Sequence, residues 1–204
     1  MSTEEFTALL VFATAMSFTP GPNTTLSAAL AANFGLRRTL GFIVAVPTGW
    51  TLMMLASGLG LGALVLALPG SNLVIKTLGV CYLVWLAWKL AGAGALGEAD
   101  PNRLRVGFWQ GVMLQFVNIK AWMLAIALAA GWVTSAEGLP APNPGQRLAI
   151  VCAVMLAFAL TSNLMYALVG SVLRQWLAHG RRLLWFNRTM AGLLLATAVW
   201  MLQA

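Results

Sequence analysis

Long apolar runs separated by short polar stretches dominate the hydrophobic pattern of the chain. The six runs cover residues 6–35, 41–66, 73–90, 107–133, 148–172 and 183–202. A helix needs roughly 20 apolar residues to cross the hydrocarbon core of a bilayer, and the runs are close to or above that length. Polar, Pro-rich or Gly-rich stretches such as 68–72 punctuate them. The pattern predicts an all-α integral membrane protein with six membrane-spanning helices.

Composition agrees with a protein embedded in lipid. Hydrophobic residues make up 60% of the 204-residue chain and charged residues 8%, whereas a soluble domain has about 25% charged residues. Six spans use most of this length, so we expect a single transmembrane domain over residues 1–204. The net charge of +7 comes from basic residues scattered in ones and twos, which is unlike the basic face of a nucleic-acid-binding protein. The predicted surroundings are a lipid bilayer, and no nucleic-acid partner is expected.

Basic residues gather in three of the connecting loops. These are Arg37, Arg38, Arg103, Arg105, Arg174, Arg181 and Arg182. Because Lys and Arg beside short loops resist translocation, these loops are predicted to be cytoplasmic and both termini to lie on the outer side. Lys76 and Arg147, at the outer ends of their spans, weaken this orientation. Residues 1–5 lack the positive region of a cleaved signal peptide, so we expect the first span to be retained.

Corresponding spans in the two halves of the chain are interrupted. Three spans per half, about residues 1–92 and 105–204, require the second half to enter the membrane inverted. The first span breaks at Thr19-Pro20-Gly21-Pro22-Asn23, and the fourth carries Gln115-Phe116-Val117-Asn118-Ile119-Lys120 near its middle. Such paired interruptions are typical of a transporter site near the membrane midplane. The pattern therefore predicts two inverted three-helix repeats with a site between them.

The break in the first span has a local chemical cause. Pro20 and Pro22 have no N–H to donate, and Gly21 permits the chain to unwind. We expect half-helices over residues 6–18 and 23–33, the second capped by Asn23 and Thr24. Its N-terminus carries partial positive charge and free N–H groups, which suit a carboxylate. The alternative is a proline kink that only shapes helix packing.

Lys120 is the charged residue nearest the middle of a predicted span. A mid-span lysine costs about 2.5 to 3.5 kcal/mol on insertion, so its side chain should face the bundle interior or a wet cavity. It either binds a substrate carboxylate and titrates during transport, or donates to backbone carbonyls freed at the break. The acidic residues all lie outside the spans or at their ends, so a proton relay has no buried carboxylate: Glu4, Glu5, Glu98, Asp100 and Glu137.

The candidate substrate-binding residues combine both breaks with the polar group Thr161-Ser162-Asn163 in the fifth span. They are Pro20, Gly21, Pro22, Asn23, Thr24, Gln115, Asn118, Lys120 and Asn163. No catalytic group, metal site or cofactor is predicted. A second hypothesis is a transmembrane thiol/disulfide electron carrier that uses Cys81 and Cys152, although these cysteines lack a CxxC spacing.

Several motifs resemble the LysE/RhtB family of amino-acid exporters. "TPGPN", followed by Gly35, Gly41 and Gly49 around the Arg37-Arg38 pair, resembles the family signature. "VCYLVWLAWKLA" and "FWQGVMLQFVNIKAWML" are most similar to its cysteine/O-acetylserine branch. The resemblance implies a multi-pass carrier of the bacterial inner membrane that exports small neutral amino acids or derivatives and is driven by the proton motive force. Its substrates would be cysteine and O-acetylserine, with homoserine or threonine as further candidates.

The resemblance also aligns the two breaks with family motifs. The family's P-G-P corresponds to Pro20, Gly21 and Pro22, and its N-P-K to residues 118–120, where Ile119 replaces the proline. Many members have an acidic residue where this chain has Trp50. The expected partners are a small amino acid and protons, while the group that carries the proton and the oligomeric state, a homo-oligomer included, stay open.

Overall fold

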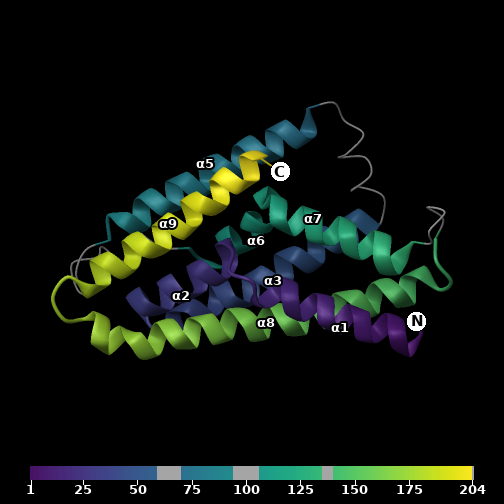
Figure 1. The fold of residues 1–204 in the computed structure, drawn as a ribbon, viewed down its shortest axis with the longest axis horizontal. Helices are drawn as coiled ribbons and strands as arrows, with labels where there is room; N and C mark the ends of the chain where they lie inside the picture. Colours follow the sequence, from purple (N-terminus) through teal and green to yellow (C-terminus); the bar gives the residue numbers. More distant parts are fainter. Residues whose placement is uncertain (59–69, 94–105, 135–139, 204) are drawn as a thin grey trace.

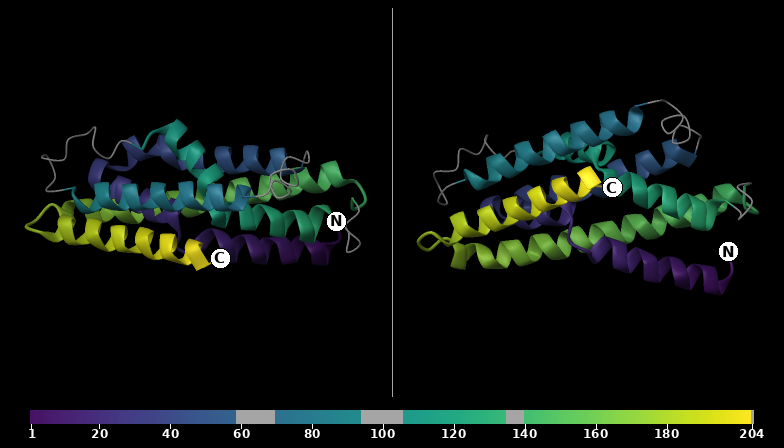
Figure 2. Two further views of the ribbon diagram at one scale, coloured as in Figure 1. Left: turned by 90° about the horizontal axis from the view of Figure 1, so that it is seen from above. Right: turned by 45° about the horizontal axis from the view of Figure 1, so that its top comes forward.

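The computed structural model describes residues 1–58, 70–93, 106–134 and 140–203, which form long helices that run roughly along one axis (Figures 1 and 2). The helices are α1 (Thr3–Phe18), α2 (Pro22–Phe34), α3 (Leu36–Gly58), α5 (Ser71–Ala91), α6 (Phe108–Val117), α7 (Ile119–Leu128), the π-helical η1 (Ala129–Val133), α8 (Pro144–Leu177) and α9 (Arg182–Gln203). Within these ranges the structure contains no strand beyond an isolated bridge between Thr134 and Pro140. The predicted all-α class is confirmed.

Several helices are long and apolar enough to cross a bilayer. Four of them are unbroken and lie within α3, α5, α8 and α9. The pair Phe108–Val117 and Ile119–Val133, bent by 68°, makes a fifth candidate. The first predicted span is two short helices of 16 and 13 residues. Six spans in two inverted repeats therefore stay a prediction.

The break in the first span lies where the prolines predict it. Helix α1 ends at Phe18 and α2 begins at Pro22, a first helical position where a missing N–H costs nothing. The N-cap is Gly21, whose N–H donates to the Thr24 hydroxyl at 3.0 Å. Asn23 and Thr24 therefore lie in the first turn rather than at the N-cap, because Pro22 starts the helix; Thr24 still takes part in capping through its hydroxyl, whereas Asn23 does not.

Two apolar cores lie on either side of the broken helices. One packs α2, α3, α5, α6 and α9 around side chains such as Leu86, Leu114 and Leu194. The other packs α1, α3, α7 and α8 around Leu9, Met53 and Leu128. Each core thus takes one half of each broken helix. The polar groups of the two breaks lie between the cores.

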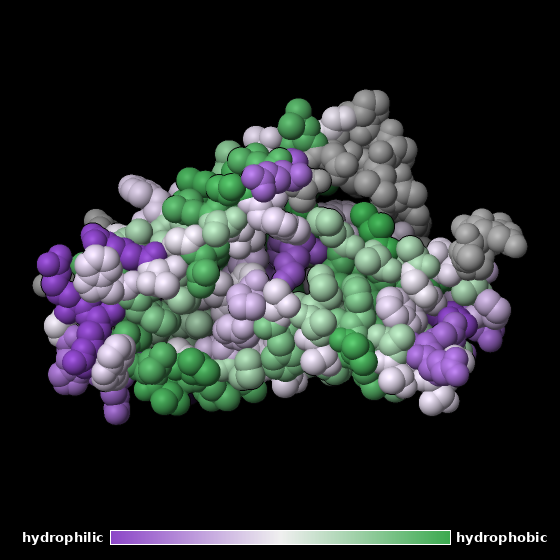
Figure 3. All heavy atoms as spheres, in the orientation of Figure 1, coloured by the Kyte–Doolittle hydropathy of each residue, from purple (hydrophilic) through white to green (hydrophobic). Residues whose placement is uncertain are grey.

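The face in Figure 3 is largely apolar between two hydrophilic ends, with smaller hydrophilic groups near its middle. One end holds the α2–α3 and α8–α9 turns, with Arg37, Arg38, Arg181 and Arg182 in them or next to them. Arg174 reaches the same turn, since a Cβ on Gly35 would lie 3.4 Å from its Nη1. The N-terminus lies toward the opposite end (Figure 1). Such a distribution suits a protein with an apolar belt in lipid and one basic end.

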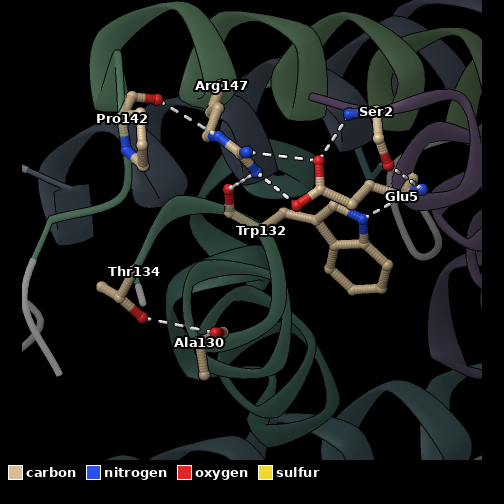
Figure 4. Close-up of polar contacts among 7 residues, drawn as sticks. All are labelled: Ser2, Glu5, Ala130, Trp132, Thr134, Pro142 and Arg147. Carbon is tan, nitrogen blue, oxygen red and sulfur yellow. Dashed lines mark hydrogen bonds and ion pairs between the residues drawn. The ribbon is translucent and has the colours of Figure 1, made fainter. Parts of the chain in front are cut away.

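An ion pair ties α1 to α8 at the other end (Figure 4). The Arg147 guanidinium donates to both carboxylate oxygens of Glu5, at 3.1 and 3.2 Å, and to the Trp132 carbonyl at 3.3 Å. The Trp132 indole N–H donates in turn to the Glu5 carbonyl at 2.8 Å. Glu5 also completes a capping box with Ser2. Glu5 thereby joins the first turn of α1 to α8 through its carboxylate and to η1 through its backbone carbonyl.

Glycines permit the closest helix contacts. A Cβ on Gly170 of α8 would lie 2.1 Å from the Ala28 carbonyl oxygen of α2. A Cβ on Gly49 of α3 would lie 2.7 Å from the Val112 carbonyl oxygen of α6. Backbone atoms therefore touch at both crossings, which is how small residues bring membrane helices together. These crossings set the positions of α2 and α3 beside the break.

We predict that Gly170→Ala lowers the free energy of unfolding by about 1–3 kcal/mol, because its methyl group forces α2 and α8 apart. Gly192→Ala in α9 is the matched control, since nothing lies within 4 Å of its Cβ position. Unfolding in detergent, followed by tryptophan fluorescence, measures both. Equal stability of the two variants would contradict the close α2–α8 contact.

Candidate functional site

The two breaks meet in the middle of the structure. The side-chain amides of Asn23 and Gln115 donate to one another, at 2.9 and 3.1 Å, across 92 positions of the sequence. Lys120 Nζ donates to the Thr19 carbonyl at 3.4 Å, so α7 reaches back across the gap between α1 and α2. Gln115 is fully buried. Side chains from the fourth predicted span thus complete the break in the first.

Other side chains replace the helical hydrogen bonds lost at each break. The Tyr166 hydroxyl donates to the Phe18 carbonyl at 3.0 Å, and the Trp122 indole donates to the Phe116 carbonyl at 2.8 Å. The Asn118 carboxamide oxygen accepts from the Lys120 N–H and caps α7. Backbone groups at membrane depth need such partners because lipid supplies none. These hydrogen bonds give partners to part of the irregular backbone at the two breaks.

A cavity of about 70 Å³ lies against this junction. Because one water requires about 10–15 Å³ by the same measure, the space suits a small solute of a few heavy atoms. Polar groups of α2, α6, α7 and α8 line part of it, and apolar side chains line the rest: Met16, Val46, Ala121, Leu124, Met155 and Ala159. The cavity has the mixed lining of a binding site for a small amphiphilic molecule.

The structure gathers almost all of the candidate residues at this cavity. Gly21, Pro22, Asn23, Thr24, Gln115, Asn118, Lys120 and Asn163 line it. Pro20 instead lines a second cavity of about 310 Å³ beside α9. In the predicted polar group of the fifth span, Ser162 also lines the first cavity, whereas Thr161 is exposed and bonds to its own helix.

Lys120 stands between the two cavities. It lines both, together with Thr19 and Gly21. Its ammonium lies beside the start of α2, where a Cβ on Gly21 would come within 3.2 Å of Nζ. Within the described ranges the salt bridge is Arg147–Glu5, so no carboxylate there pairs with Lys120. Its charge and the positive end of α2 together favour a bound anion. Its contact with the Thr19 carbonyl is the structural role that the sequence left as an alternative.

Several polar residues with interior positions were not among the candidate site residues. Ser27 donates to the Asn163 carboxamide oxygen at 2.8 Å and ties α2 to α8. Asn33 and Asn187 form a reciprocal, fully buried amide pair between α2 and α9. Ser17 and Trp50 line the first cavity with polar atoms that have no partner among the described residues. The sequence does not indicate that these side chains face the interior, because the pattern of a single apolar span does not show which of its polar side chains do so.

The two cysteines lie away from this junction. Cys81 in α5 is exposed and Cys152 in α8 is buried, and both are free thiols. Neither lines the two cavities described above. The geometry offers no support for a thiol relay through the broken helices.

Comparison with known proteins places this geometry in a family. The family described as LysE type translocator matches residues 14–204. The chain belongs to the LysE type translocator family. The resemblance inferred from the two break motifs is thereby confirmed, and the family name indicates a transporter rather than an enzyme.

Curated relatives align along nearly the whole chain. The cysteine/O-acetylserine efflux protein of Klebsiella pneumoniae is 32% identical over 193 residues, which cover 94% of each chain. The protein of the same name in Salmonella typhimurium is 32% identical over 189 residues, 90% of each chain. An Escherichia coli O9:H4 protein with this name is 28% identical over 185 residues. No solved structure matches the chain.

We predict that Asn23→Leu and Gln115→Met each lower stability by about 1–3 kcal/mol, because each leaves one buried amide without its partner. The double variant should lose less than the sum of the two, by at least about 0.5 kcal/mol, since both partners are then removed together. A double-mutant cycle of unfolding free energies in detergent measures this coupling. Strictly additive losses would show that the two amides do not interact.

Proposed function

We propose that this protein is a secondary transporter that exports small neutral amino acids or their derivatives, such as cysteine and O-acetylserine, from the cytoplasm. The observation that carries the proposal is the small cavity where two broken helices meet, which combines a helix N-terminus with the Lys120 ammonium. The family membership and the printed names of the relatives support export of amino acids.

In this proposal the substrate carboxylate binds between Lys120 and the first N–H groups of α2. Pro22 has no N–H, so the donors are those of Asn23 and Thr24 in the first turn. The amide oxygens of Gln115, Asn118 and Asn163 supply acceptors for the substrate ammonium. One cavity thus offers hydrogen-bond donors for the substrate carboxylate and acceptors for its ammonium group.

Binding and release are coupled through the contact between Lys120 and Thr19. This contact lies between the two cavities, and an incoming carboxylate competes with the Thr19 carbonyl for the ammonium. Moving Lys120 opens a route past the break. Two inverted halves, about residues 1–92 and 105–204, would rock around this point and alternate access between the two sides.

In this proposal Lys120 is the residue that couples substrate transport to proton movement. No Asp or Glu is among the described residues that line the two cavities. An ammonium that is half-buried between them is the titratable group best placed to lose and regain a proton during a cycle. Export would then be driven by the proton motive force.

The proposed orientation puts the basic end in the cytoplasm and both termini outside, in the inner membrane of a bacterium. Arg37, Arg38, Arg181 and Arg182 lie at that end, whereas Arg103 and Arg105 fall outside the described residues. Arg147, which weighs against this orientation in the sequence, is neutralised by its ion pair with Glu5. Homoserine and threonine are further candidate substrates in this proposal.

We predict that Lys120→Ala inserts normally but loses export, because the carboxylate then meets no ammonium. Proteoliposomes or cells preloaded with labelled cysteine, O-acetylserine, threonine or lysine measure efflux with and without a proton gradient. Lys89→Ala is the matched control, since Lys89 lies over the Trp85 ring away from the cavity. The wild-type protein should export cysteine and O-acetylserine only with the gradient.

Two outcomes would contradict this proposal. Full export by Lys120→Ala would remove Lys120 from the site and from the coupling step. No efflux of any of the four compounds by a well-inserted wild-type protein would overturn the assigned substrates.

A separate prediction concerns the cysteines. The double variant Cys81→Ser/Cys152→Ser should export at a rate close to wild type, because neither thiol lines the proposed site. The same efflux assay measures it, with a thiol-specific label to confirm that both cysteines are gone. Complete loss of export in a well-folded double variant would favour a thiol relay.

A further inference from the structure

Two buried polar groups on the cavity wall are left without hydrogen-bond partners. Trp50 of α3 is only 5% exposed, and its indole Nε1 makes no hydrogen bond within the described part of the chain. The hydroxyl oxygen of Ser17 in α1, a half-buried residue, is also shielded and unpaired there. Both residues line the cavity at the junction of the broken helices. Because native proteins satisfy most buried polar side chains, two such groups on one cavity wall point to a missing ligand.

The surroundings of Trp50 differ from those of the amide groups at the breaks. Trp50 belongs to the apolar core of α1, α3, α7 and α8, together with Leu124 and Met155, and Met16 packs against the same core. These three side chains line the cavity as well. The break residues Asn23 and Gln115 are occupied with each other. One part of the cavity is thus apolar, with a free indole N–H and a hydroxyl as its polar features.

The position of the indole is set by a close helix crossing. Gly49, the preceding residue, packs against the Val112 backbone, where a Cβ would come within 2.7 Å of the carbonyl oxygen. Neither α3 nor α6 can shift there without opening this contact. The N–H is therefore held in place before any ligand arrives, as a specificity group needs to be.

The chemistry of the two groups selects among small amino acids. An indole N–H only donates, and a hydroxyl both donates and accepts. An ester or acyl carbonyl is a strong acceptor, a thiol is a weak one, and an ammonium is none at all. Apolar neighbours suit a short acyl chain.

We infer that Trp50, with Ser17, binds the acyl oxygen of an O-acylated amino-acid side chain and makes the transporter selective for such substrates. This inference rests on the proposed export function, and it concerns which substrate is preferred. The carboxylate end of the same molecule would lie at Lys120 and the start of α2. A side chain that ends in an ammonium would leave both the indole N–H and the apolar wall unmatched.

The test compares two substrates in one preparation. Proteoliposomes loaded with labelled O-acetylserine and cysteine, at mildly acidic pH where acyl migration to the amine is slow, report the ratio of the two efflux rates. Trp50→Phe keeps the aromatic ring and removes the N–H. It should lower O-acetylserine efflux about ten-fold relative to cysteine efflux, because the acyl oxygen loses its donor. Ser17→Ala should shift the ratio in the same direction.

Trp88→Phe is the matched control. Trp88 is highly exposed in α5 and lies outside the cavity, so the same chemical change there should leave the ratio at its wild-type value. A monodisperse elution profile in detergent, like that of wild type, shows that the Trp50→Phe variant is folded. If Trp50→Phe does not fold, the ratio of the two efflux rates in Ser17→Ala tests the inference by itself.

An unchanged ratio in Trp50→Phe or Ser17→Ala, while wild type exports both compounds, would overturn this inference and leave the proposed function standing. An equal fall in both rates would also overturn it, since that outcome indicates a structural role. A wild-type protein that exports neither compound would overturn the proposed function itself, and the inference with it.

Discussion

Everything at the centre of this protein depends on one constraint: backbone polar groups at membrane depth require partners that lipid cannot provide. Pro20 and Pro22 remove two donors from the first predicted span, and the chain turns at Asn118 in the fourth. The structure meets this demand by bringing the two breaks together. Side chains from α7 and α8 reach carbonyls at the end of α1, and Asn23 and Gln115 pair across the gap.

The rest of the fold keeps this junction in place. Two apolar cores hold the halves of each broken helix on opposite sides of it. Glycine crossings at Gly49 and Gly170 bring α3 and α8 to backbone contact with their neighbours. The Glu5–Arg147 ion pair joins the first turn of α1 to α8 and adds to the apolar packing of α1. The polar groups of the two breaks thus lie beside a small space that the packing leaves.

The same groups that satisfy the breaks are the ones that a zwitterion would use. A carboxylate is a stronger partner for Lys120 than the Thr19 carbonyl, because charge-assisted hydrogen bonds are the strong ones. In the proposed transport cycle, ligand binding and opening of the contact between the two cavities are one event. The indole N–H of Trp50 differs from these groups, since it has no hydrogen-bond partner within the described ranges. Under the proposal, the carboxylate contributes binding energy and the substrate side chain contributes selectivity at different walls of one cavity.

The sequence by itself determined the class of the protein, the sites of both breaks and eight of the residues that line the cavity. These features are local, since apolar runs of a given length, prolines without an N–H and a lysine in mid-span each act through their own stretch of chain. Tertiary structure alone decided that Gly21 caps α2, that Pro20 faces a different cavity, and that Ser17, Ser27 and Trp50 face the interior. It also decided the pairings Asn23–Gln115 and Glu5–Arg147, which join residues far apart in sequence. Hydrophobicity marks where a span lies, but the direction that each side chain faces depends on how the helices pack against one another.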